Sequence, residues 1–185
     1  MITYTRLWAP AFAVLLVGAV TACGSSDPKP AAPAAPVPAS QAPSAAVSPS
    51  ASAQLGLKPG TAATVPVQDG TVRVTVRSLK TRKTACGADW DPPANGVFVI
   101  ADVLVEVTSG EFSFSGGEFQ WLADDGTTAD LAGFTGCTTS PLQGANGLPA
   151  GQKRAGQLVF DVKSTAGTLG FSPDLSGVPA ASWRP

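Results

Sequence analysis

The strongest restriction on the fold is a run of alternating residues from Val97 to Val107. Every second side chain in this run is apolar: Val97, Val99, Ala101, Val103, Val105 and Val107. Because successive side chains of a β-strand point to opposite faces, this period of two predicts a strand with one face in the core. The opposite face mixes acidic and apolar side chains: Phe98, Ile100, Asp102, Leu104 and Glu106. A strand that is partly apolar on both faces is expected at the centre of a sheet.

The same period, interrupted by glycine turns, continues from Thr61 onward. The Asp69-Gly70 pair predicts a tight turn, after which Val72, Val74 and Val76 share the inner face of a strand. No window of the sequence predicts an amphipathic helix. Several short strands at this spacing predict an all-β fold, an immunoglobulin-like antiparallel β-sandwich.

The later strands follow from the same pattern. Residues 118–131 predict a hairpin that turns at Asp124-Asp125-Gly126. Residues 157–162 predict a second central strand, and short strands over 168–171 and 181–183 close the domain. Alternation around Phe112 and Phe114 favours a separate strand over 111–115 that turns at Gly116-Gly117, with a loop as the alternative.

The order of turns and strands resembles a family of uncharacterised domains. The motifs follow one another in this order: Gly-x-Val-x-Val, the segment from Pro93 to Val107, Asp125-Gly126, Pro149-Ala150-Gly151-Gln152, and the strand that ends at Val162. Such domains occur in cell-envelope lipoproteins of Gram-positive bacteria, actinobacteria especially, and are similar to the mycobacterial immunogenic secreted protein family. The resemblance covers residues 60–185 and implies an immunoglobulin-like sandwich. Its motifs are turn and strand signals, so it assigns no catalytic or binding residue.

The N-terminus has the order of an export signal. Arg6 supplies a positive charge, and Leu7 to Val20 is an uncharged run too short to cross a bilayer. The following Val20-Thr21-Ala22-Cys23 resembles a lipobox, which implies a signal peptide over residues 1–22 and a lipid on Cys23. The chain would then be anchored at the extracytoplasmic face of the cell membrane. The alternative is an ordinary secretory signal cut near Ala22, with an incidental thiol at Cys23.

Two composition changes define the domain organisation. Residues 24–52 consist almost wholly of Pro, Ala and Ser and offer little apolar surface to bury, so a disordered linker is predicted over 23–60. The folded domain is expected over 61–185, a length sufficient for its own core.

Cys86 and Cys137 are the cysteines that remain once Cys23 is assigned to lipid. An even number of cysteines in an oxidising compartment predicts a disulfide bond between them. The alternative, two free buried thiols, fits poorly with the loop-like residues that flank both positions.

The segment around Trp90 is the strongest candidate for binding. Asp89 and Asp91 flank this indole beside the predicted disulfide, and Phe134 lies in a glycine-rich loop that is expected to face it. Trp90 would stack on a sugar or on a partner's side chain, and the aspartates would accept hydrogen bonds. The alternative is a turn whose tryptophan covers the edge of the core.

Other candidate sites have weaker support. Asp124, Asp125 and Asp130 lack the spacing of a calcium loop. Glu106, Glu111 and Glu118 have no pattern that pairs them as acid and base. The basic cluster of Lys80, Arg82 and Lys83 is interpreted as a solvated strand end. We expect no metal site.

Composition narrows the function further. The chain has no histidine, which removes the commonest general base and metal ligand. A net charge of -1 gives no basic face for nucleic acid. The expected function is a non-catalytic, lipid-anchored binding or adaptor domain without a cofactor, whose partner is an envelope protein, a glycan or a small molecule. The alternatives are an enzyme or enzyme accessory that acts on cell-wall polymer through surface carboxylates, and a surface protein without a dedicated ligand.

Overall fold

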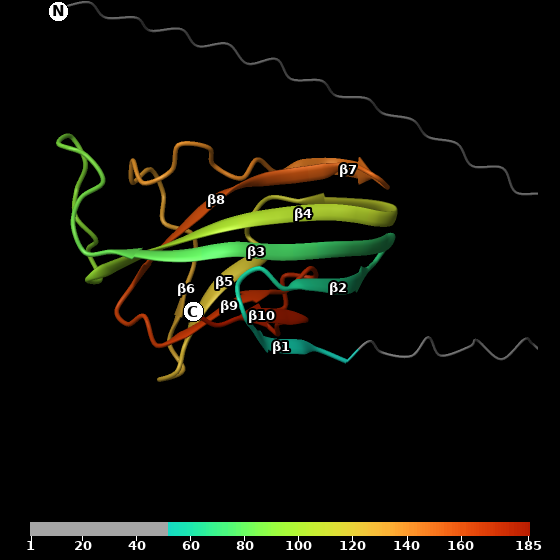
Figure 1. Ribbon diagram of the computed structural model, residues 1–185, viewed down its shortest axis with the longest axis horizontal. Helices are drawn as coiled ribbons and strands as arrows, with labels where there is room; N and C mark the ends of the chain where they lie inside the picture. The colour runs from blue at the N-terminus through green and yellow to red at the C-terminus, as the bar shows by residue number, and fades with distance from the viewer. Residues whose placement is uncertain (1–51) are drawn as a thin grey trace, which may run out of the picture. The chain divides into compact units, whose positions relative to one another are not determined.

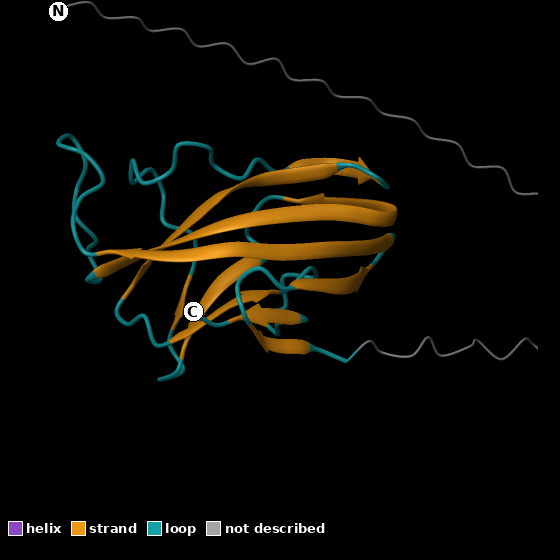
Figure 2. Ribbon diagram, viewed as in Figure 1, coloured by secondary structure: helices purple, strands orange, loops and turns teal. Residues whose placement is uncertain are grey.

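A computed structural model describes residues 52–185, and this part of the chain is built from strands, turns and loops (Figure 2). The predicted signal peptide, Cys23 and most of the predicted linker lie outside the described residues. No helix long and apolar enough to cross a membrane is found within 52–185.

Two sheets pack against each other, as the sequence predicted (Figure 1). The first sheet has the order β1-β10-β9-β5-β6: Gln54–Leu57, Ala181–Trp183, Gly167–Phe171, Phe119–Ala123 and Thr128–Ala129. The second has the order β2-β3-β4-β7, with β8 also paired to β4: Ala62–Val67, Gly70–Arg82, Val97–Phe114, Ala145–Pro149 and Lys153–Val162. All strand pairs are antiparallel except β1 with β10.

Strand β4 is the central element of the second sheet. The six apolar residues predicted for its inner face are all buried, and they form one core with the first sheet. The prediction of a separate strand over 111–115 is wrong, because β4 runs without a break to Phe114. Gly110, at a φ of 66°, takes the backbone past the β2–β3 turn at Gly70. The chain then continues into pairing with β7.

Strand β8 departs from its predicted central position. It pairs along its length with β4, but its other edge meets the chain at two isolated bridges, Leu131 with Phe160 and Pro141 with Gln157. Both faces of β8 carry apolar side chains for a reason other than a central position in the sheet. The outward-facing Val159 is 4% exposed, although it does not belong to the core between the sheets. A loop therefore provides the cover that a neighbouring strand was expected to provide.

The folded region begins before the predicted boundary at residue 61. Strand β1 lies inside the predicted linker and pairs with β10, and the Gln54 N–H donates to the Ala180 carbonyl at 2.9 Å. At the other end of β1, the Arg184 N–H donates to the Leu57 carbonyl at 2.9 Å. A four-residue strand has too weak a sequence pattern to be recognised without its partner.

Candidate binding site at the disulfide loops

A disulfide bond between Cys86 and Cys137 joins two loops at one end of the sandwich. Loop 83–96 connects β3 to β4, and loop 130–144 connects β6 to β7 (Figure 1). The two Cα atoms are 5.0 Å apart, and 51 residues separate the cysteines in sequence. The predicted disulfide is confirmed, and it brings together the two segments that carry the predicted binding residues.

Trp90 lies directly on the backbone of loop 130–144. A methyl group added at Gly136 would overlap the indole ring, and Gly136 has a φ of 67°, which favours glycine. The tryptophan nevertheless remains 42% exposed. One part of the ring thus covers the second loop, while the rest is available to solvent.

The four predicted binding residues surround a single hollow of about 530 Å³, here called the acidic hollow. Asp89, Trp90 and Asp91 come from loop 83–96, and Phe134 comes from loop 130–144. Phe98 and Asp161 also line the hollow, from β4 and β8. Phe134 is 99% exposed, so its aromatic ring has no packing role within the described chain.

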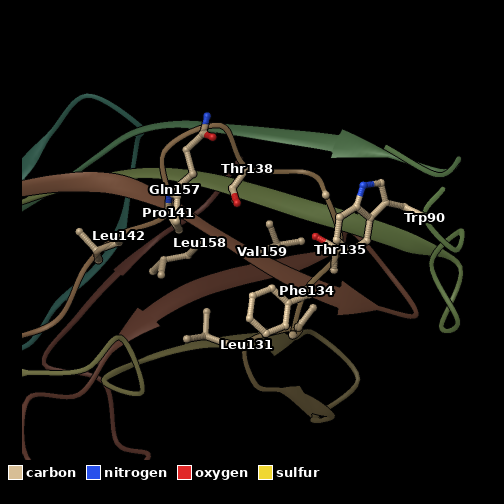
Figure 3. Close-up of a pocket in the computed structure, with 13 residues that line it drawn as sticks. Trp90, Leu131, Phe134, Thr135, Thr138, Pro141, Leu142, Gln157, Leu158 and Val159 are labelled. Carbon is tan, nitrogen blue, oxygen red and sulfur yellow. The ribbon is translucent and has the colours of Figure 1, made fainter. Parts of the chain in front are cut away.

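A second hollow of about 380 Å³, here called the apolar pocket, lies between loop 130–144 and β8. Figure 3 shows Trp90 at one end and Leu142 at the other, with Leu158 and Val159 between them. Its polar side chains are uncharged: Thr135, Thr138 and Gln157. Trp90 and Phe134 line both hollows.

The sequence did not predict the apolar pocket. Its walls depend on how loop 130–144 meets the edge of β8. No residue pattern in either segment indicates that the two are in contact. One signal was present: Val159 lies on the strand face that it shares with Gln157 and Asp161, where an apolar side chain indicates a cover.

Loop 130–144 is attached to β8 on both sides of the apolar pocket. The Ala132 N–H donates to the Val159 carbonyl at 2.8 Å. Further along, Gln157 donates to the Ser140 carbonyl at 2.8 Å and accepts from the Leu142 N–H at 3.0 Å. The residues between these attachments arch away from the strand and reach Cys86, which leaves the pocket beneath them.

Loop 83–96 is held by hydrogen bonds at both ends. Near its start, the Arg82 Nε donates to the Ala85 carbonyl at 3.0 Å. Near its end, the Asp161 carboxylate accepts from the backbone N–H groups of Ala94 and Asn95 at 2.8 and 3.0 Å. These bonds and the disulfide hold the loop in one orientation, and a loop held in this way would lose less conformational entropy to a ligand than a free one.

The three aspartates considered as calcium ligands have separate partners. Asp124 pairs with Arg184 at 2.7 Å, and the hydrogen bond from the guanidinium holds the pKa of that carboxyl below its ordinary value. Asp125 accepts from the Thr127 hydroxyl at 2.7 Å, which also lowers its pKa. Asp130 accepts from the Gln120 amide at 2.7 Å. Within residues 52–185, no three or more histidine, cysteine, aspartate or glutamate side chains are grouped so that they could hold a metal ion.

The three glutamates considered for an acid–base pair also lie at separate places in the fold. Glu106 pairs with Arg73 at 2.7 Å and with Lys153 at 3.1 Å on the outer face of the second sheet. Glu118 is buried and accepts from the Gly116 N–H at 2.8 Å, which closes the turn after β4. Glu111 is exposed on β4 opposite Pro149.

The basic cluster lies at the end of β3, where Lys80, Arg82 and Lys83 are all exposed. None of the three lines the acidic hollow or the apolar pocket among the residues that the structure describes. Their position agrees with the interpretation as a solvated strand end.

Comparison with solved structures supports the fold. The chain is similar to a secreted protein from Mycobacterium tuberculosis, MPT63, whose crystal structure aligns with a TM-score of 0.57 at 21% sequence identity. The alignment covers 74% of this chain and 100% of that one. No protein-family model and no curated protein matches the sequence. At this level of identity, the likeness establishes a shared sandwich fold.

Proposed function

We propose that this chain is a lipid-anchored, extracytoplasmic binding module of the bacterial cell envelope that acts without catalysis. The lipobox resemblance at Cys23 supports the anchor. The Cys86–Cys137 disulfide and the likeness to a secreted protein support an oxidising, extracytoplasmic location. The partner is an envelope protein or a glycan.

One observation carries the binding role: two exposed aromatic side chains stand between two hollows on disulfide-linked loops. Trp90 and Phe134 are 42% and 99% exposed. Burial of apolar surface contributes about 25 cal/mol per Å², so a partner that covers both rings gains substantially. Aromatic residues held on a rigid frame are typical of binding hot spots.

The direction of the anchor also supports this assignment. The first residue of β1, Gln54, pairs with Ala181, which pairs with Phe171, which in turn pairs with Phe119. Phe119 follows the turn at the Phe114 end of β4, whereas the disulfide loops lie at the Val97 end. A tether that enters at β1 leaves the loop end of the sandwich open to a partner.

The anchor is tested by intact mass of the protein from native membranes, with alkylation before and after reduction. We expect lipid mass on Cys23, and we expect Cys86 and Cys137 to be alkylated only after reduction. An unlipidated chain that starts elsewhere would remove the anchor, and free thiols at Cys86 and Cys137 would contradict the oxidised state.

Binding is tested by a photo-cross-linking amino acid placed at Phe134 in cells. Val178, 72% exposed in the loop before β10, provides a matched control position. We expect a discrete adduct from position 134 that is absent from position 178 and is lost when Trp90→Ala is added. Equal labelling at both positions would contradict a dedicated site.

A further inference from the structure

We infer that the acidic hollow and the apolar pocket form one bipartite site for a protein partner segment that carries a cationic side chain next to an apolar one. This inference rests on the proposed binding function and names the chemistry of the partner. It follows from the charge of one hollow, the neutrality of the other, and the wall that they share.

The acidic hollow has an unbalanced negative charge. Its lining contains Asp89, Asp91 and Asp161, and no lysine or arginine among the described residues. Asp89 and Asp91 form no ion pair within residues 52–185. The Asp161 carboxylate accepts two backbone N–H groups of loop 83–96 and forms no ion pair within residues 52–185. An anionic ligand would meet three carboxylates, whereas a cation would be attracted by all of them.

The aromatic walls favour the same sign of charge. Trp90 and Phe134 both line the acidic hollow and expose ring surface. The face of an aromatic ring attracts lysine and arginine side chains, and the attraction is strongest for tryptophan. A neutral sugar could stack on the same rings, but it would not use the charge of the carboxylates.

The apolar pocket selects for a different group. Leu131, Leu142, Leu158 and Val159 contribute apolar surface, and its lining contains no charged side chain among the described residues. An ionised group placed there would lose hydration without a compensating partner. An apolar side chain of a partner fits this chemistry.

The shared wall sets the spacing between the two groups. Trp90, Ala132, Gly133, Phe134 and Thr135 line both hollows. A ligand that fills both must therefore cross this wall, with its cationic and apolar groups on neighbouring positions. A short segment of a basic amphipathic peptide meets this requirement.

The experiment compares three six-carbon probes that differ in their polar group: hexylammonium, hexanoate and hexyl glucoside. The protein is the whole chain with Cys23→Ser, so that no attached lipid competes for the probes. Binding is followed by NMR shifts of the Trp90 indole N–H at low salt. We expect hexylammonium to bind about tenfold more tightly than hexanoate, a difference of about 1.4 kcal/mol to which ion attraction and cation–π contact both contribute.

Two variants separate the charge from the fold. Asp89→Asn combined with Asp91→Asn should reduce the preference for ammonium to about twofold, and added salt should act in the same direction. Glu111→Gln, which removes an exposed carboxylate from the far end of β4, should leave the preference unchanged. Backbone NMR spectra confirm that both variants keep the fold.

The outcomes distinguish this inference from the proposed function. Equal binding of hexylammonium and hexanoate, or a preference that survives the double aspartate substitution, would overturn the cationic specificity. Tighter binding of hexyl glucoside would also overturn it and would favour a glycan, while the binding function would stand. Failure of every probe to shift Trp90 would overturn the bipartite site, and the Phe134 cross-link would then decide the binding function separately.

Discussion

Gly136 controls the position of Trp90, and through it the wall between the two hollows. The indole can lie on the loop backbone only because position 136 has no Cβ atom. The backbone at Gly136 also has a positive φ, which glycine adopts more readily than other residues. Gly136 has no side chain that could contact a ligand, yet it determines where the Trp90 ring lies.

Gly136→Ala should displace the indole and destabilise the fold by about 1 kcal/mol or more, through backbone strain and steric overlap. The measurements are urea unfolding and the NMR shift of the Trp90 indole N–H. Gly133→Ala is the matched control, because a methyl group there meets open space. Unchanged Trp90 shifts in Gly136→Ala would contradict the contact.

Glu106 should make part of the stability dependent on pH. Hydrogen bonds from Arg73, and secondarily from Lys153, hold the pKa of Glu106 below its ordinary 4.5. A carboxyl with a lowered pKa in the folded state stabilises the fold above its unfolded pKa and loses that effect as pH falls through the folded value. We expect stability to fall with acidification below about pH 4.5, and Glu106→Gln to reduce that slope.

Urea unfolding between pH 7 and pH 3 measures this slope. Glu111→Gln is the control, because Glu111 forms no ion pair within residues 52–185. A slope that is the same in Glu106→Gln and in the unsubstituted protein would show that this ion pair does not contribute.

At the scale of elements, the disulfide and the edge of β8 shape the site together. Loop 130–144 meets β8 at two places and meets loop 83–96 through Cys137. Phe98 and Val159, buried on the outer side of the second sheet, lie at this end and line the two hollows. The loops thus act as a cover for a small apolar surface as well as a frame for the site.

Loss of the disulfide should be costly because it closes a long stretch of chain. For a separation of 51 residues, the chain-entropy estimate is about 4 kcal/mol. We expect Cys86→Ser with Cys137→Ser to lose stability of this order in urea unfolding and to weaken any contact made by Trp90. Reduction of the unsubstituted protein should reproduce the loss, and the reductant should have no effect on the double variant.

At the scale of the molecule, the chain is a sandwich whose two ends differ. The disulfide loops, the acidic hollow and the apolar pocket occupy the Val97 end of β4, and β1 begins toward the Phe114 end. Both sheets contribute to one core, in which Trp121 and Trp183 are fully buried. This arrangement places the start of β1 and the two hollows at opposite ends of the sandwich.

Strand β1 should be part of the folding unit. Leu57 packs against the core, and the strand hydrogen-bonds β10 beside Trp183, whose Nε1 donates to the Thr61 carbonyl at 2.8 Å. We expect a chain that begins at residue 52 to be as stable as the full chain, and one that begins at residue 61 to be less stable. Urea unfolding and hydrogen exchange in β10 measure the difference, and equal protection in both truncations would restore the boundary at 61.

The sequence by itself determined which faces are buried, because side-chain alternation is a local property of each strand. The valines of β3 and β4 are buried as predicted, and the even number of cysteines indicated the disulfide. Two carboxylates around an indole, beside a predicted disulfide, indicate Trp90 as a candidate from the sequence alone. The four candidate residues do surround one hollow.

The tertiary structure alone decided which edges meet. The continuation of β4 past Gly110, the docking of β1 on β10 and the cover of β8 by loop 130–144 all depend on backbone hydrogen bonds between distant segments. Backbone groups are the same in every residue except proline, so such pairing leaves little trace in the side-chain pattern. The apolar pocket is a product of this edge pairing, and for that reason it became visible only in the folded chain.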